Sequence, residues 1–352
     1  MVRAIIAAVI AALALVAWSP VLAGPSAMEL TESALEHLKA GRLDAVVADA
    51  DAALAIDPRM APAYLLRGDV HQARGNYGGA IKDYSAAITI NPDLDLARLN
   101  RGIANINLGD FESAVEDLEK AARDRSLESK ARGELSVALR HLGRHRQALA
   151  EVDRAYRLKP IAQWLVVRGD ILLANGEPGM ALKTFTDALA DPKERLTALD
   201  GRARAHFELR DYARAIADYE KIIAEAPDSV AALNDLCWTR AVARSGLAQA
   251  EIACDRALKL TPEDPLVYAT RAYLWLAFAR PDAALADAEA ATRFDPDYPD
   301  GRFLRAVALE RLGRGAEAAV EMSVALKLDP EIARTYAGHG MSPQTVSSQR
   351  RD

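Results

Sequence analysis

The chain has two cysteines, Cys237 and Cys254, which lie 17 positions apart. Two thiols can form a disulfide, remain free as small buried side chains, or bind a metal. A structural zinc site needs four ligands, usually with closely spaced cysteine pairs, and this spacing does not resemble one. We therefore set metal binding aside. The choice between a disulfide and two free thiols depends on the compartment and on the elements that hold the cysteines.

Six histidines offer a second source of chemistry. His141 and His145 are four residues apart, a spacing that binds a metal when both lie on one continuous helix. Gly143 lies between them and marks a turn, so the two imidazoles need not share a face. His71 and His206 fall on packed positions of expected helices. We therefore predict no metal site.

Carboxylates gather at 49–51 and 282–289, where solvated helix faces are expected. The sequence contains no nucleophile elbow, phosphate loop or dinucleotide fingerprint. We predict that the protein is not an enzyme and has no cofactor. The catalytic alternative would assemble a site from four residues of expected first helices: Asp170, Asp200, Arg204 and His206.

The composition is that of a folded protein, with 51% hydrophobic and 27% charged residues among 352. The formal net charge is −6, and no basic stripe is present. Binding to a phosphate backbone requires clustered lysine and arginine, so we predict no nucleic-acid partner.

The first 23 residues resemble an export signal. Arg3 precedes an apolar run from Ala4 to Trp18, Pro20 follows, and 21–23 is a small-residue cleavage pattern. We predict a signal peptide over 1–23, no membrane span after cleavage, and a periplasmic location. The alternative is an uncleaved segment that anchors the protein to the inner membrane. The run is shorter than the ~20 apolar residues that a spanning helix needs.

The elements that must position any site recur at a fixed interval. Prolines that close segments such as LAIDP, ITINP and LKLDP stand near multiples of 34 residues. Before each one lie two small residues seven apart, such as Ala80 and Ala87, which mark one helix face. The preceding helix carries its own small residue, such as Gly68, and glycine or aspartate marks the turn between the two helices.

This pattern resembles the tetratricopeptide repeat, a helix-turn-helix unit of about 34 residues. The resemblance implies an all-α fold, a right-handed superhelical solenoid over residues 24–330. Nine repeats would start near residues 27, 61, 95, 129, 162, 196, 230, 265 and 299, the fifth one residue early and the seventh with an extra residue near Arg244. Residues 331–352 would form a short capping helix, a truncated tenth first helix, and a disordered tail from Gly338.

In this register the cysteines lie nearly opposite one another on the two helices of the seventh repeat. An exported protein meets an oxidising compartment, so we favour a disulfide between Cys237 and Cys254. Two buried free thiols remain the alternative.

In this family the first helices line a concave groove that binds peptides or protein domains. Carried over, this implies a protein-binding groove that contains Leu99, Asn100, Ile103, Asp170, Arg204, Asn234, Trp238, Tyr273 and Phe303. Trp238 would be either an exposed binding anchor or a packing residue against the neighbouring first helix.

The sequence therefore predicts an exported scaffold that binds a protein or peptide through this groove, in envelope assembly, export or protein maturation. Self-association through the solenoid ends and a catalytic groove are the alternatives.

Overall fold

The computed structural model describes residues 24–342, which form 19 helices (α2–α20) and no strand. The predicted signal peptide, 1–23, lies outside the described residues, as does 343–352 of the predicted tail. The first helices of the nine pairs begin within one residue of the predicted repeat starts. The predicted all-α fold of repeated helix pairs is thus confirmed.

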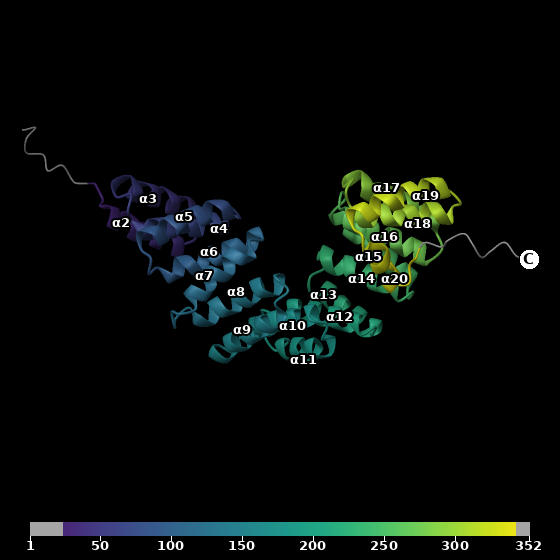
Figure 1. Ribbon diagram of the computed structural model, residues 1–352, viewed down its shortest axis with the longest axis horizontal. Helices are drawn as coiled ribbons and strands as arrows, with labels where there is room; N and C mark the ends of the chain where they lie inside the picture. The colour runs from purple at the N-terminus through teal and green to yellow at the C-terminus, as the bar shows by residue number, and fades with distance from the viewer. Residues whose placement is uncertain (1–23, 343–352) are drawn as a thin grey trace, which may run out of the picture. The chain divides into compact units, whose positions relative to one another are not determined.

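The described chain divides after Pro160 into two compact parts. The sequence predicts one array, and the division falls where the fifth repeat begins one residue early. We call residues 24–160 the N-terminal part. Its four pairs, drawn in purple to blue-green in Figure 1, are α2 (Ala27–Lys39) and α3 (Leu43–Ile56), α4 (Ala61–Ala73) and α5 (Tyr77–Ile90), α6 (Asp95–Leu108) and α7 (Phe111–Ala121), and α8 (Glu128–His141) and α9 (His145–Leu158).

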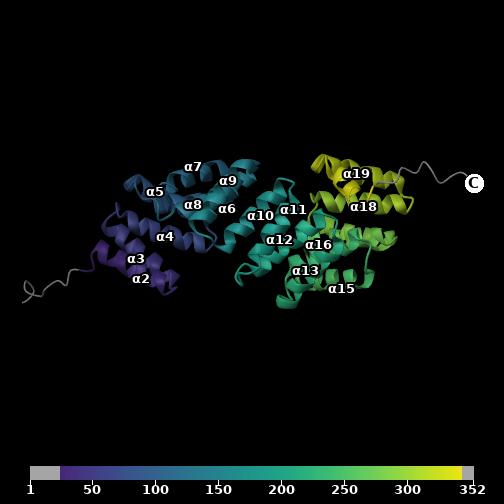
Figure 2. The same ribbon diagram turned by 90° about the horizontal axis from the view of Figure 1, so that it is seen from below.

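Residues 161–342 form the C-terminal part, which has five pairs and one short final helix. They are α10 (Ala162–Ala174) and α11 (Pro178–Ala188), α12 (Arg195–Glu208) and α13 (Tyr212–Glu225), α14 (Val230–Val242) and α15 (Leu247–Leu260), α16 (Pro265–Ala277) and α17 (Pro281–Phe294), α18 (Pro299–Arg311) and α19 (Gly315–Leu328), and α20 (Ile332–Gly338). Figures 1 and 2 both place α18 between α16 and α19, and α18 contacts both of these helices.

The turn inside each pair follows from its residues. Gly75 has φ of 72°, a left-handed conformation that costs glycine little, and it ends α4. The side chain of Asn76 then accepts a hydrogen bond from the backbone N–H of Gly79 and caps α5. Residues 243–246 separate α14 from α15, one residue more than the three that separate α4 from α5.

Each pair packs because a small residue on the first helix admits a large one from the second. A Cβ atom added to Gly68 would lie 2.6 Å from Cε1 of Tyr84, and one added to Gly169 would lie 2.5 Å from Cζ of Phe185. Both rings are completely buried. Because each helix has only 11 to 14 residues in these pairs, it depends on this burial for stability.

The last helix, α20, follows the ninth pair where the sequence predicts a short helix, and it touches both helices of that pair, α18 and α19. The ring of Tyr336 also lies 5.9 Å from that of Tyr273 on α16 and 6.2 Å from that of Trp238 on α14. This end of the helix therefore reaches the first helices of two earlier repeats, which was not predicted. The predicted disorder from Gly338 is wrong up to residue 342, because Met341 is only 1% exposed.

Among residues 24–342, no helix combines the length and the apolar character that crossing a membrane requires.

Candidate functional site

The predicted groove residues lie on first helices, on a surface that we call the first-helix face. In the C-terminal part this face is formed by α10, α12, α14, α16 and α18. Here α10 contacts α12, and α16 contacts both α14 and α18, so side chains of successive repeats lie next to one another. The predicted residues differ widely in exposure, and this decides which of them a partner can reach.

Three predicted groove residues belong to the core. Leu99, Tyr273 and Phe303 are 1%, 2% and 0% exposed, so their assignment to a partner-binding surface is wrong. Successive residues on a helix are rotated by about 100°, and these three face neighbouring helices instead of the open surface. The C-terminal segment adds to the burial, because the ring of Tyr336 stacks on Phe303 with centroids 4.6 Å apart.

Trp238 is half-buried and joins an aromatic cluster. Its ring centroid lies 4.5 Å from that of Tyr273 on the next first helix and 5.3 Å from the ring of His339. The structure thus supports the packing role for Trp238 that the sequence left open, although one edge of the ring still borders the surface pockets described below.

The C-terminal segment, residues 332–342, is held to the first-helix face by polar contacts as well. The hydroxyl of Tyr273 donates to the backbone oxygen of His339 at 2.6 Å, and that of Tyr336 donates to Oδ1 of Asp300 at 2.8 Å. Nη2 of Arg311 lies 3.1 Å from Sδ of Met341. This segment therefore occupies part of the surface that the sequence assigned to a partner.

Arg204 links two repeats across the first-helix face. Its guanidinium donates to Asp170 at 2.7 Å and to Asp200 at 3.0 Å, and 44% of the side chain remains exposed. His206 lies elsewhere: it is 6% exposed, and its Nδ1 is 3.9 Å from Oδ2 of Asp211, the cap of α13. Burial lowers the pKa of His206. The four residues of the catalytic alternative do not form one site.

In the N-terminal part, Asn100 also links two repeats. Its side-chain amide donates to Oδ1 of Asp69 at 2.9 Å, and the hydroxyl of Tyr84 donates to the same oxygen at 2.7 Å. Burial raises the pKa of Asp69, and the two hydrogen bonds oppose that change. Ile103, on the same helix as Asn100, is half-buried.

Two pockets open on the first-helix face of the C-terminal part, with volumes of about 240 and 280 Å³. Asp235 and Trp238 line both. Asn234 lines only the smaller one, where it is 6% exposed and its Oδ1 has no hydrogen-bond partner. Burial, together with the charge of Asp200, raises the pKa of Asp235 to about 6. These pockets are the candidate binding site.

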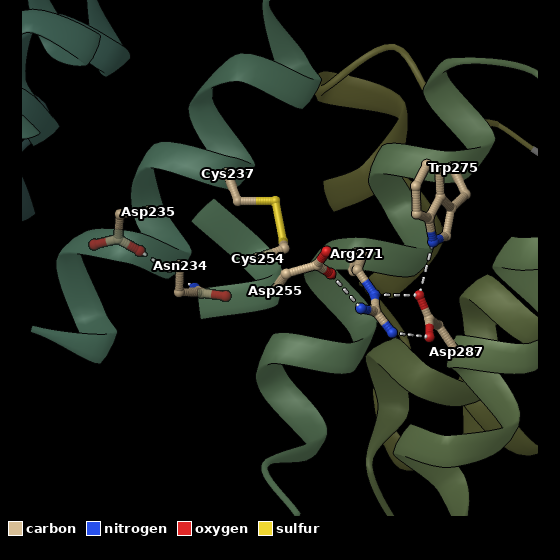
Figure 3. Close-up of a disulfide and its surroundings, with 8 residues drawn as sticks. All are labelled: Asn234, Asp235, Cys237, Cys254, Asp255, Arg271, Trp275 and Asp287. Atoms are coloured by element: carbon tan, nitrogen blue, oxygen red, sulfur yellow. Dashed lines mark hydrogen bonds and ion pairs between the residues drawn. A yellow bond between two sulfur atoms is a disulfide. The ribbon is translucent and has the colours of Figure 1, made fainter. Parts of the chain in front are cut away.

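The cysteines lie beneath this site, on α14 and α15 (Figure 3). Cys237 and Cys254 are joined as a disulfide with Cα atoms 5.6 Å apart, and both are completely buried. They stand where other repeats have a small residue and a large ring, such as Gly68 and Tyr84. A covalent bond thus replaces that packing contact in the seventh repeat.

A recurring ion pair was not anticipated from the sequence. Arginine on a first helix makes two hydrogen bonds, each 2.7 or 2.8 Å long, to an aspartate 16 residues later on the second helix: Arg67–Asp83, Arg101–Asp117, Arg202–Asp218 and Arg271–Asp287. Each arginine stands directly before the small residue of its helix, so the constant spacing was a usable signal.

The fourth of these pairs corrects the expectation that the carboxylates at 282–289 lie on a solvated helix face. Asp287 is only 6% exposed, and it also accepts the indole N–H of Trp275 at 2.8 Å. Arg271 reaches Asp255 as well, at 2.6 Å (Figure 3). These aspartates hold the two helices of each pair together. Within residues 24–342, no cluster of three or more histidine, cysteine or acidic side chains could hold a metal ion.

Comparison with known proteins agrees with this architecture. A family model described as "TPR repeat" matches residues 68–109, and one described as "Tetratricopeptide repeat" matches 99–162, 166–230, 201–265 and 270–331. Together they cover well over half of the chain.

Curated relatives match over short stretches. The chain is 40% identical over 74 residues to the TPR repeat-containing thioredoxin TDX of Arabidopsis thaliana and 36% identical over 76 residues to the STIP1 homolog of Dictyostelium discoideum. These stretches are 21% and 22% of this chain, and only 20% and 14% of the two relatives.

Solved structures match over most of the chain. A tetratricopeptide repeat protein from Parabacteroides merdae aligns with a TM-score of 0.55 and 18% identity, over 81% of this chain and 100% of that one. Yeast Tom70 aligns with a TM-score of 0.49 and 16% identity, over 89% and 87%. At 18% identity, the likeness to the Parabacteroides merdae protein shows the fold alone.

Proposed function

The chain belongs to the tetratricopeptide repeat family, and from this premise we propose that it is an exported, non-catalytic scaffold that binds a protein or peptide through the first-helix face of its C-terminal part. The observation that carries the proposal is the pair of pockets around Asp235 and Trp238. Repeats of this family typically serve protein–protein interaction. A peptide that follows the first helices would meet both pockets in turn.

The polar residues around the pockets support a binding role. Arg204 is exposed beside the larger pocket, and its charge is shared between two aspartates of neighbouring repeats. Such a network fixes the register of adjacent repeats and leaves hydrogen-bonding capacity at the surface. Apolar anchoring with polar groups that set the register is a common way to hold an extended peptide.

Site-specific crosslinking tests which face is used. A photo-crosslinking amino acid at Arg204, on the first-helix face, is expected to capture a protein partner in the native cell. The matched control is the same amino acid at Ile252, which is 59% exposed on the second helix α15. Capture of the same partner from Ile252 alone would overturn the assignment of the face.

Export is part of the proposal, and it rests on the sequence of residues 1–23. A disulfide persists in oxidising compartments, so the Cys237–Cys254 bond supports a periplasmic location. We propose cleavage after Ala23. Mass spectrometry of the protein from its native cell should find Gly24 at the N-terminus, and an intact Met1 would favour the anchored alternative. Envelope assembly, export and protein maturation are settings that fit such a scaffold.

Self-association through the C-terminal end is the second candidate, because α19 exposes an apolar surface. Val320 is 64% exposed, and Leu326 and Leu328 are each 39% exposed. Sedimentation across a hundredfold concentration range tests this candidate. A mass that rises with concentration in the wild type, but not in a Val320→Glu variant, would support it.

A further inference from the structure

The smaller pocket has an unusual wall. It lies among α14, α16 and α18, and the C-terminal segment closes it with Tyr336 and His339. Tyr336 is 4% exposed and Met341 is 1% exposed, so this wall is firmly packed. The pocket, of about 240 Å³, has room for one long side chain and not for a folded element.

The polar groups that line this pocket include two carboxylates, Asp235 and Asp300, and the amide of Asn234. The side-chain amide of Asn234 donates to Oδ1 of Asp235 at 3.4 Å. The Oδ1 atom of Asn234 has no hydrogen-bond partner, although the residue is only 6% exposed. Asp300 already accepts one hydrogen bond from Tyr336. An unsatisfied buried acceptor is unfavourable, so a ligand that donates hydrogen bonds would stabilise this arrangement.

The charges around the pocket favour a cation. No ion pair involves Asp235 among the described residues. It faces Asp200 and Arg204 on α12, and the pocket that it lines also contains Asp300 on α18 and His339 of the C-terminal segment. The charge of Arg204 acts on Asp235 from a distance and lowers its pKa, but the guanidinium itself is hydrogen-bonded to Asp170 and Asp200. The carboxylate of Asp235 is therefore poorly solvated and has no cation in direct contact.

The apolar residues that line the pocket suit the rest of such a ligand. Trp238 presents part of its ring, and Leu266 and Ala269 add apolar surface. A cation is attracted to the face of an indole ring, and the methylene groups of a lysine or arginine can cover apolar walls.

We propose that this pocket binds the cationic side chain of a lysine or arginine from a partner's extended segment, with its charged head against the carboxylate of Asp235. This inference rests on the proposed function and names the chemistry of the partner. An arginine fork can bond both oxygens of one carboxylate at once, so arginine should bind more tightly than lysine.

A binding experiment with a minimal probe tests the proposal. Of the four tryptophans, Trp18 precedes the cleavage site, so mature protein labelled with 5-fluorotryptophan should show signals for Trp164, Trp238 and Trp275. The blocked tripeptide Ala-Arg-Ala should shift the Trp238 signal in a saturable way. The same peptide with citrulline, which has the shape without the charge, should bind at least tenfold more weakly.

Two variants distinguish binding of the peptide in this pocket from general attraction of a cationic peptide to an acidic protein. Asp235→Asn should weaken the arginine peptide at least tenfold, and the exposed Glu263→Gln, which removes one charge elsewhere, should leave it unchanged. Circular dichroism of Asp235→Asn checks that the variant is folded. Equal binding of the citrulline peptide, or full binding by Asp235→Asn, would overturn the proposal. If crosslinking from Arg204 succeeds in that case, the scaffold function stands and only the cation pocket falls.

The pH provides a second readout. Because burial raises the pKa of Asp235 to about 6, affinity should fall as the pH drops through this range. His339→Gln should keep that dependence, since the carboxylate and not the imidazole supplies the charge. A dependence that disappears with His339 would contradict the role of Asp235.

Discussion

Asp69 in the N-terminal part and Asp235 in the C-terminal part are partly buried carboxylates on first helices, and burial raises the pKa of both. Asp69 accepts hydrogen bonds from Tyr84 and Asn100 at 2.7 and 2.9 Å. Asp235 has only the amide of Asn234 at 3.4 Å. A buried acid with its own donors is part of the packing between repeats, whereas one without them is available to a ligand.

The cores of the two parts differ in a related way. Between Ala27 and Ala104, buried apolar side chains form separate clusters of three or four residues. In the C-terminal part, one cluster joins residues from Leu199 to Met341. The aromatic rings of α14, α16, α18 and α20 connect its repeats. We therefore expect the C-terminal part to unfold more cooperatively than the segment 27–104.

The largest expected effect on stability tests whether the core of the C-terminal part is continuous across its repeats. Phe303→Ala should lower the free energy of unfolding of the C-terminal part by about 3–5 kcal/mol, because it empties a fully buried ring position. Hydrogen exchange should then speed up across α14 to α20. The matched change in the N-terminal part, Tyr84→Ala, should speed exchange mainly in α4 to α6. Equally local responses in both parts would contradict the comparison of the two cores.

Removal of the disulfide is expected to have the next largest effect on stability. Replacing Cys237 and Cys254 by alanine should cost the C-terminal part about 3 kcal/mol in the loop-entropy model. The described tryptophans, Trp164, Trp238 and Trp275, all lie in that part, so urea unfolding followed by their fluorescence reports on it alone. Exchange in the N-terminal part should not change. A wild-type protein whose two thiols react with alkylating reagent before reduction would remove the basis of this prediction.

Substitutions in two of the repeated arginine–aspartate pairs, one in each part of the chain, extend the comparison of the two parts. Asp117→Asn leaves Arg101 with a weakened partner and should cost about 1–2 kcal/mol. Asp287→Asn should cost more, about 2–3 kcal/mol, because Asp287 accepts the indole N–H of Trp275 in addition to its two bonds from Arg271. Thermal unfolding of the two variants measures the difference. Equal losses would show that the indole contact adds nothing.

The repeat pattern made the fold predictable, because packing fixes small residues such as Gly68 and Gly169 at constant intervals. Glycine is required there by the rings of Tyr84 and Phe185, and the interval located the start of each first helix to within one residue. The arginine–aspartate pairs had an equally constant spacing. That signal was overlooked because aspartate on a second helix was taken to be solvated.

The candidate site was less predictable. Periodicity defines a helix face only coarsely, so Tyr273 and Phe303 were assigned to the open surface although they are buried. A short capping helix was predicted here, but nothing local indicated that Tyr336 and Met341 would be buried against earlier repeats. Their partner surface is assembled from three separate repeats, and only the folded structure brings it together.

The smallest expected effect returns to the two carboxylates. A raised folded-state pKa means that Asp235 favours stability below its unfolded-state value, about 3.9, and that this contribution is lost as the pH rises through about 6. Asp235→Asn carries no charge and should therefore stabilise the protein at pH 7.5 by about 1–2 kcal/mol, with no gain at pH 4. Asp69→Asn also removes a partly buried charge, but its neutral amide oxygen accepts more weakly than a carboxylate from Tyr84 and Asn100, so it should be destabilising by about 1 kcal/mol at pH 7.5. Urea unfolding at the two pH values measures both variants.

If the two substitutions change the free energy of unfolding in opposite directions at pH 7.5, Asp235 is kept at a cost to stability, as expected of a residue retained for binding. Changes in the same direction would remove the distinction between the two acids.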